Sequence, residues 1–138
     1  MPASRVKKSS EVRFHGVGRR KSSVARVWMK PGKGAITVNG RKHDDYFSTK
    51  NSIMAVETPL KLVSQVKDFD VSVNVFGGGI TGQADAIKLG ISRAVLVADQ
   101  DKRPLLKSNG LLRVDSRVVE RKKYGQRGAR RKFQFVKR

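Results

Sequence analysis

The charge of this chain is distributed so unevenly that it limits which part can fold into a compact body. Residues 1–30 carry nine Lys or Arg against one acid, residues 31–101 carry eight of each sign, and residues 102–138 carry fourteen against two. The net charges of these segments are therefore +8, 0 and +12. Such charge opposes a compact state unless a polyanion screens it. We therefore expect a neutral globular body between two basic ends that contact phosphate.

The length of 138 residues fits one domain with extensions. We predict a basic N-terminal extension over residues 1–13, a globular domain over residues 14–119 and an extended basic C-terminal tail over residues 120–138. Residues 121–138 hold nine Lys or Arg and no acid, a composition that buries too little apolar surface to fold alone. The tail should therefore become ordered against its partner.

Several classes of site are excluded by composition. The chain has no cysteine, which rules out disulfides and zinc sites built on sulfur, and His15 with His43 makes a poor metal set. We predict no metal and no cofactor. The sequence also contains no apolar run long enough to cross a membrane, and residues 1–13 lack the apolar centre of a secretory signal. We expect a cytoplasmic protein with no membrane partner.

The apolar spacing predicts a small α+β fold. Alternation over residues 24–29 and 35–39, across a Pro-Gly turn at 31–34, predicts a β-hairpin. Helical spacing follows over residues 52–63, with Ser52 as its cap, then a strand at 71–75 and a helix over 83–98. This order predicts a small mixed β-sheet packed with helices on one face, followed by the long basic tail.

Two sets of apolar residues are assigned from this spacing. The predicted core contains Val27, Ile36, Val38, Val56, Leu60, Val73, Val75, Ile87, Ile91 and Val95. A last short element is predicted to dock through Leu111, Leu112, Val114, Val118 and Val119.

The glycines Gly77, Gly79 and Gly82 follow a predicted strand and open a predicted helix, which is the context of a dinucleotide-binding loop. The expected acidic partner should end a second parallel strand, whereas Asp99 and Asp101 end the helix itself. We therefore expect no nucleotide cofactor and no small-molecule substrate. Two compatible interpretations remain: backbone amides that approach an RNA phosphate, and a tight turn that needs positive φ.

The segment Gly16-Val17-Gly18-Arg19-Arg20-Lys21-Ser22 resembles a phosphate loop only superficially, because Arg20 and not glycine precedes the lysine and the spacing is wrong. Three adjacent cations before a strand are better suited to clamp phosphates, since Arg binds them bidentately and Lys acts as a point charge. The alternative is a solvated run of charge. In a chain this basic, we favour phosphate contact.

The carboxylate pairs Asp68 with Asp70 and Asp99 with Asp101 allow a second class of function, a metal-dependent nuclease. Their positions at strand and helix ends favour turns and caps instead. A nucleoid-type DNA-binding protein is a third possibility that charge alone permits. We expect no enzyme and keep both alternatives for testing.

Aromatic rings interrupt the cations of the tail at Tyr124, Phe133 and Phe135. Rings among cations can stack on unpaired bases while the cations hold the RNA backbone. The alternative is hydrophobic anchoring on a neighbouring protein. The charge of the tail favours RNA.

Several motifs together resemble the small-subunit (30S) ribosomal protein nine family. They occur in the family's order, and the resemblance covers residues 14–138. The matching segments are residues 18–27, 38–40, 77–79, 85–91, 117–125 and the closing Lys137-Arg138. The Lys-Arg ending is typical of the bacterial or organellar branch.

The resemblance implies a fold like the second domain of ribosomal protein five and a structural role in translation. It implies binding to 16S-type rRNA and neighbouring proteins in the head of the small subunit, in cytoplasmic or organellar ribosomes. The tail is expected to reach P-site tRNA with Lys137 and Arg138. The residues expected to bind rRNA are Arg19, Arg20, Lys21, Ser22, Gly77, Gly78, Gly79, Arg121, Lys122, Lys123, Tyr124, Arg127, Arg130, Arg131 and Lys132.

Overall fold

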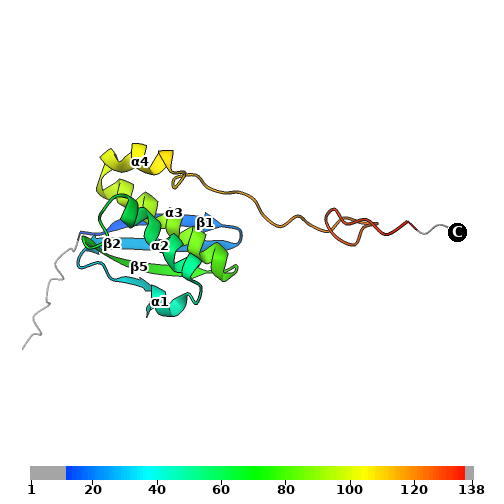
Figure 1. Cartoon of the computed structure of the whole chain (residues 1–138), viewed down its shortest axis with the longest axis horizontal. Coiled ribbons are helices and arrows are strands. Elements are labelled where there is room, and N and C mark those ends of the chain that lie inside the picture. The colour runs from blue at the N-terminus through cyan, green and yellow to red at the C-terminus, as the bar shows by residue number, and fades with distance from the viewer. Residues whose placement is uncertain (1–11, 136–138) are drawn as a thin grey trace, which may run out of the picture.

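The computed structural model describes residues 12–135, in which a sheet and its helices precede a long basic segment (Figure 1). The strands are β1 (Phe14–Arg20), β2 (Ser23–Pro31), β3 (Ile36–Val38), β4 (Arg41–Lys42) and β5 (Phe69–Phe76). The helices are α1 (His43–Tyr46), α2 (Lys50–Leu62), α3 (Ile80–Ala98), the 3-10 helix η1 (Gln100–Lys102) and α4 (Arg103–Ser108).

The five strands form one mixed sheet in the order β1-β2-β5-β3-β4. Strand β5 runs parallel to β3 and antiparallel to β2, and the remaining pairs are antiparallel. Helices α2 and α3 lie over one face of this sheet (Figure 1). The predicted α+β class, a small mixed sheet with helices on one face, is therefore confirmed.

The predicted hairpin between residues 24–29 and 35–39 is wrong, because β5 lies between those two segments. Ser72 of β5 pairs with Trp28 on one side and with Thr37 on the other. The loop after β2 is held over the start of β5, where Asp70 Oδ1 accepts backbone hydrogen bonds at 2.9–3.1 Å from residues 33–35. The hairpin partner of β2 is β1, and Lys21 in their turn has φ 53°.

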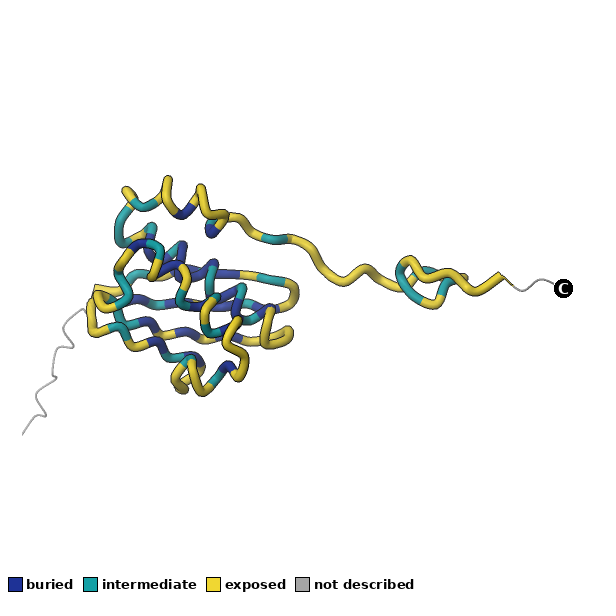
Figure 2. The backbone as a smooth tube through the Cα atoms, viewed as in Figure 1, coloured by how far each residue is buried: buried dark blue, intermediate teal, exposed yellow. Residues whose placement is uncertain are grey.

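The core lies between the sheet and the helices, and all ten predicted core residues are buried (Figure 2). Strict alternation along β2 and β5 places one side of each strand in the core and the other side toward solvent. Phe47 and Met29 are the largest fully buried side chains, and neither was predicted. Among the five residues predicted to dock after α3, Leu111 is buried and Leu112 packs partly against the core. The prediction is wrong for Val114, Val118 and Val119, which are exposed.

The two long helices differ from their predicted boundaries at the N-terminus. Helix α2 begins at Lys50 with Thr49 as N-cap, so Ser52 is buried inside the helix and does not cap it. Pro59 does not end the helix, and its carbonyl still accepts a hydrogen bond from Val63 N at 3.3 Å. Helix α3 begins at Ile80, three residues before the predicted start.

Strand β1 approaches α3 unusually closely because glycines occupy its inward positions. A Cβ atom at Gly18 would collide with the Ala86 carbonyl oxygen and lie 2.6 Å from the Gly90 nitrogen. A Cβ atom at Gly16 would likewise collide with the carbonyl oxygen of Gly90 in α3. Backbone contact of this kind places the next inward residue of the strand, Arg20, directly beside α3.

Residues 113–123 after α4 contain no helix or strand and lead away from the body (Figure 1). Farther along, an isolated antiparallel bridge joins Gln126 and Lys132, and Arg127 N donates to Arg131 O at 2.9 Å. The segment 126–132 therefore folds back on itself as a short loop. Within residues 12–135, no helix is long and apolar enough to cross a membrane.

Candidate nucleic-acid interface

Two predicted phosphate-binding segments, residues 19–22 and 77–79, meet at one end of the sheet. The β1–β2 turn contains Lys21 and Ser22, and the glycine turn leaves β5 directly beside it. Ser23 is fully buried between them, and its Oγ donates a hydrogen bond to the Gly77 carbonyl oxygen at 3.0 Å. The next residue, Val24, pairs with Phe76 at the end of β5. Antiparallel pairing of β2 with β5 thus joins segments that lie more than 50 positions apart.

The glycine segment is a tight turn of the kind predicted. Gly77 and Gly78 have φ of 76° and 63°, a region that L side chains avoid. A Cβ at Gly77 would also lie 2.5 Å from the Ser22 carbonyl oxygen. Gly79 is the N-cap of α3 and has no side-chain cap, and the space around its Cα is open. Residues 79–81 at this helix start are exposed, so the phosphate interpretation remains compatible with the turn.

The basic residues of this end point in two directions. Arg19, Lys21 and Ser22 are exposed. Arg20 follows the inward side of β1, and only 16% of its side chain is exposed. The prediction that Arg20 contacts rRNA stays untested, but its guanidinium is already engaged within the chain.

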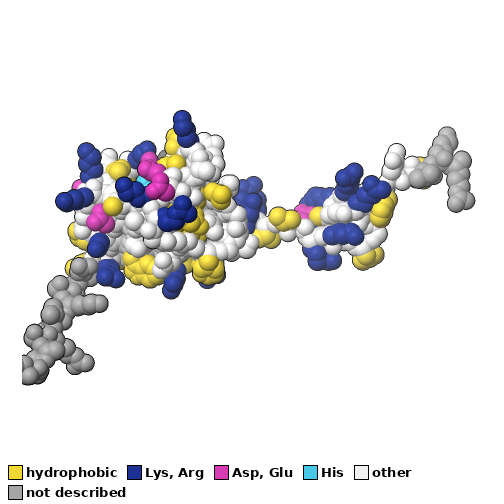
Figure 3. Space-filling model, turned by 90° about the horizontal axis from the view of Figure 1, so that it is seen from below, with side chains coloured by type: hydrophobic (Ala, Val, Ile, Leu, Met, Phe, Trp, Pro, Cys, Tyr) yellow, Lys and Arg dark blue, Asp and Glu magenta, His cyan; other side chains and the backbone are white. Residues whose placement is uncertain are grey.

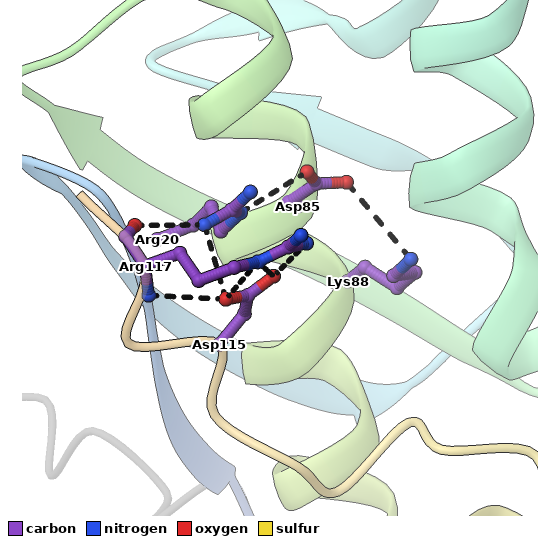
Figure 4. A network of polar contacts seen from close by, with 5 residues as sticks. All are labelled: Arg20, Asp85, Lys88, Asp115 and Arg117. Atoms are coloured by element: carbon purple, nitrogen blue, oxygen red, sulfur yellow. Dashed lines mark hydrogen bonds and ion pairs between the residues drawn. The ribbon is translucent and has the colours of Figure 1, made fainter. Parts of the chain in front are cut away.

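Arg20 joins α3 to the segment 113–117, which precedes the tail (Figure 4). Its Nε lies 3.7 Å from Asp85 Oδ2 of α3, and Asp85 is also near Lys88 at 3.9 Å. Its Nη1 lies 3.4 Å from Asp115 Oδ1 and donates to the Arg117 carbonyl oxygen at 3.0 Å. The network lines a groove of about 630 Å³ with Arg19 and the segment 110–117. The network thus attaches residues 115–117, which follow the globular body, to strand β1.

Asp115 is the centre of a second, local set of contacts. Arg117 Nη2 donates to Asp115 Oδ2 at 2.7 Å, and its backbone nitrogen donates to Oδ1 at 3.1 Å. These hydrogen bonds from Arg117, with the charge of Arg20, hold the pKa of the Asp115 carboxyl far below its usual range. The same pair raises the pKa of Arg117. The sequence analysis did not predict this network. Asp115 is one of only two acids after residue 101, and an isolated acid among so many cations indicates an ion pair.

The cations of the described tail are spread over its surface (Figure 3). Glu120 accepts hydrogen bonds from Arg130, with 2.7 Å to Nη2, and lies 3.6 Å from Lys123 Nζ. Arg130 thereby lowers the pKa of Glu120. Lys123 is half-exposed, and the exposed predicted rRNA contacts of the tail are Arg121, Lys122, Tyr124, Arg127, Arg130, Arg131 and Lys132.

The aromatic rings of the tail are available to a partner. Tyr124, Phe133 and Phe135 are all exposed. The Arg127 guanidinium carbon lies 5.4 Å from the centroid of Phe133, a cation–π arrangement. The predicted tRNA contacts Lys137 and Arg138 lie outside the described residues.

The carboxylates considered for a nuclease have structural partners. Hydrogen bonds from the backbone of Ala35 and Lys33, then Gly34, lower the pKa of Asp70. Asp99 caps η1 by accepting from Asp101 N at 3.0 Å. The turn and cap roles are therefore confirmed for these two residues.

One group of possible metal ligands occurs in the described part of the chain: His43, Asp44 and Glu57, with ligand atoms within 4.8 Å of one another. Glu57 already pairs with Lys61 Nζ at 2.8 Å and with His43 Nε2 at 2.7 Å. Both hydrogen bonds lower the pKa of Glu57, that of Lys61 more strongly. The hydrogen bonds of Glu57 with His43 and Lys61 are sufficient to bring these side chains together, so their proximity does not indicate a bound ion.

Comparison with known proteins identifies the family of this chain. The family model described as ribosomal protein S9/S16 matches residues 18–138. The small ribosomal subunit protein uS9 of Christiangramia forsetii is 53% identical over 125 residues, covering 91% of this chain and 98% of that protein. Proteins of the same name from Cytophaga hutchinsonii and Anaeromyxobacter sp. strain K are 52% and 55% identical, with 91% and 88% of this chain and 98% and 94% of those proteins covered. The resemblance seen in the sequence motifs is thus confirmed, and the chain belongs to the ribosomal protein S9/S16 family of structural, non-enzymatic proteins.

Proposed function

We propose that this chain is a structural component of the small ribosomal subunit, where it binds 16S-type rRNA in the head during translation. Its sheet and helices form a neutral body, and its basic ends neutralise phosphates where RNA segments crowd together. The likeness to proteins named small ribosomal subunit protein uS9 supports this assignment. Neighbouring proteins of the head would contact the same body.

The observation that carries the proposal is the convergence of Arg19, Lys21 and Ser22 with the turn at Gly77 and Gly78. Exposed cations there lie beside backbone amides at the start of α3, which is the arrangement that favours phosphate. Arg20 then contributes indirectly, because it fixes the point from which the tail leaves. The tail adds seven exposed or half-exposed cations over residues 121–132.

We further propose that the tail reaches P-site tRNA with Lys137 and Arg138. An extended chain spans about 3.3 Å per residue, so an eighteen-residue tail has a maximum reach of roughly 55 to 60 Å. Cations at such a tip can contact a tRNA phosphate without supporting the fold. The cellular setting follows from this role: a ribosome in the cytoplasm, or in an organelle.

Sedimentation of a cell lysate through a sucrose gradient tests the ribosomal assignment. The chain should migrate with small subunits and whole ribosomes at low salt and at moderate salt. In parallel, equimolar duplex DNA and 16S-type rRNA should compete for the purified chain, with rRNA preferred. Migration mainly as free protein, or equal binding to DNA, would favour the nucleoid-type alternative. Magnesium-dependent RNA cleavage that Asp99→Ala or Asp68→Ala abolishes would favour the nuclease.

The tRNA contact requires a separate experiment on assembled subunits. Replacement of Lys137 and Arg138 by Gln keeps the length of the tail and removes two charges. We expect normal assembly and weaker retention of P-site tRNA. The matched control is Lys50→Gln with Lys61→Gln on α2, which removes two exposed charges from the body. Unchanged tRNA occupancy on the Lys137/Arg138 variant would reject this part of the proposal.

A further inference from the structure

The face of the sheet opposite α2 and α3 exposes a group of polar, basic and aromatic residues, of which the proposed function uses only Arg19. Alternation places His15 and Arg19 of β1, Arg26 and Trp28 of β2, and Asn74 of β5 on this open face. Trp28 is half-buried, and the other four residues are exposed. A purely solvated sheet face does not need a tryptophan.

Trp28 is held by two neighbours that stack on or over its ring. His15 pairs with Trp28 in the β1–β2 register, and the two ring centroids are 4.8 Å apart with an angle of 34° between the planes. His15 Nδ1 donates to the Val27 carbonyl oxygen at 3.0 Å, which fixes the imidazole. The Arg26 guanidinium carbon lies 5.3 Å from the Trp28 centroid. Arg held on an aromatic ring keeps its outward donors available in a fixed orientation.

A groove of about 580 Å³ runs beside this cluster and is lined by both polar and apolar side chains. Its walls include Trp28, Thr37, Ser72 and Asn74, together with Arg13 and Lys30. The acid in the lining, Asp70, directs Oδ1 to three backbone N–H groups of the loop 33–35. The groove thus combines hydrogen-bonding groups with positive charge.

We propose that this open face is a second RNA-binding surface that takes a stretch of unpaired nucleotides. Arg26 and Arg19 contact phosphates, and the His15–Trp28 pair contacts bases. Arg19 and Arg26 are diagonal neighbours on adjacent strands, about 7 to 8 Å apart at Cα. The described residues provide no carboxylate partner for either guanidinium. The inference rests on the proposed function, because it assumes that the chain binds rRNA.

Charge complementarity selects RNA over a protein as the occupant. Arginine and aromatic residues are common in protein interfaces as well, but the net charge of +20 on this chain favours a polyanion. Unpaired RNA is the ligand that uses both kinds of group, since bases stack on aromatic rings and on guanidinium planes. The groove lies on the opposite face from the Arg20 network, so the two surfaces can be tested independently.

Trp28 is the only tryptophan in the chain, so its fluorescence reports this face specifically. The full chain is titrated with a transcript of the head domain of 16S-type rRNA, and acrylamide quenching of Trp28 is measured with and without RNA. A fully paired RNA duplex of equal length forms the second arm. We expect the transcript, and not the duplex, to reduce the quenching constant at least twofold. Arg26→Glu should abolish this protection and lower affinity about tenfold, whereas Lys50→Glu, the same charge change on α2, should preserve the protection.

The other possible results of the quenching experiment each test the open-face inference. Binding of the transcript without protection of Trp28 overturns the open-face inference and leaves the proposed function intact. Equal protection by the duplex overturns the assignment to unpaired nucleotides. Absence of any RNA binding by the full chain rejects the proposed function, and the inference with it.

Discussion

Arg20 in β1 donates a hydrogen bond from Nη1 to the backbone carbonyl oxygen of Arg117, 97 positions later in the chain, at 3.0 Å. The contact is possible because Gly16 and Gly18 let β1 approach α3, which places the following inward residue at the edge of the helix. The direction in which the basic tail leaves the body is thus set by packing inside the body.

Arg20→Ala should release the segment 113–117 without unfolding the sheet. The variant loses the hydrogen bond to the Arg117 carbonyl and the ion pairs with Asp85 and Asp115. We expect amide hydrogen exchange of residues 113–117 to accelerate at least several-fold, because opening of a segment becomes easier when its tertiary contacts are removed. Exchange in β2 and β5 should not change.

Two variants control for charge and position. Arg20→Lys retains the charge but not the planar set of donors, so it should give an intermediate rate. Arg19→Ala removes the neighbouring charge from the exposed side of β1 and should leave exchange at 113–117 unchanged. Equal acceleration in all three variants would mean that general electrostatics, and not the Arg20 contacts, holds this segment.

The attachment should persist to unusually low pH. Hydrogen bonds from Arg117 lower the pKa of Asp115 in the folded state. A lowered folded pKa gives stabilisation that is complete above the unfolded pKa of about 3.9 and is lost as pH falls through the folded pKa. We expect the Asp115 carboxyl to titrate by NMR well below the ordinary range of an Asp side chain. Arg117→Ala should return its midpoint toward the ordinary value; a midpoint that is normal in the unaltered chain would contradict the described contacts.

Gly18→Ala should destabilise the whole body. The new methyl group meets backbone atoms of Ala86 and Gly90, which cannot move without shifting α3. Overpacking of this kind costs about 1 to 3 kcal/mol. Chemical denaturation measures the free energy of unfolding. Gly79→Ala is the matched control, because a Cβ there meets nothing within 4 Å and φ is not positive, so we expect little change. Equal stability of the two variants would show that β1 and α3 can separate at no cost.

The sequence was sufficient to predict the core but not the order of the strands. Alternation in β2 and β5 is a local property, so Val27 and Val73 were assigned correctly to the buried side. Pairing is not local: the turn at 31–34 looked like a hairpin, whereas β5 enters between the two segments and Asp70 holds the turn. Strand β1 was missed because glycines take the place of apolar residues on its inward side.

For the candidate site, the sequence identified residue types but not their orientation. Adjacent arginines at 19 and 20 look equivalent in a charge run, yet a strand directs them to opposite faces. The proximity of Ser22 to Gly77 likewise depends on antiparallel pairing of β2 with β5. Neither fact is available before the sheet order is known.

The salt dependence of rRNA binding should separate the charges of the tail from its aromatic rings. Removal of residues 121–138 eliminates nine Lys or Arg. Each lost phosphate contact reduces the slope of log K against log salt by about 0.7 on a single strand and about 0.9 on a duplex. If half of these cations contact phosphate, the slope should become shallower by roughly 3 to 4. Filter binding at several salt concentrations gives both slopes.

An aromatic variant provides the contrast, with Tyr124, Phe133 and Phe135 all replaced by Leu. Stacking on unpaired bases is worth about 1 to 3 kcal/mol per base and involves no counterion release. This variant should therefore bind rRNA more weakly at every salt concentration while its slope stays that of the full chain. If affinity is unchanged, the exposed rings serve another partner, and hydrophobic anchoring on a neighbouring protein becomes the better explanation. If the slope of the truncated chain equals that of the full chain, the tail does not contact phosphate.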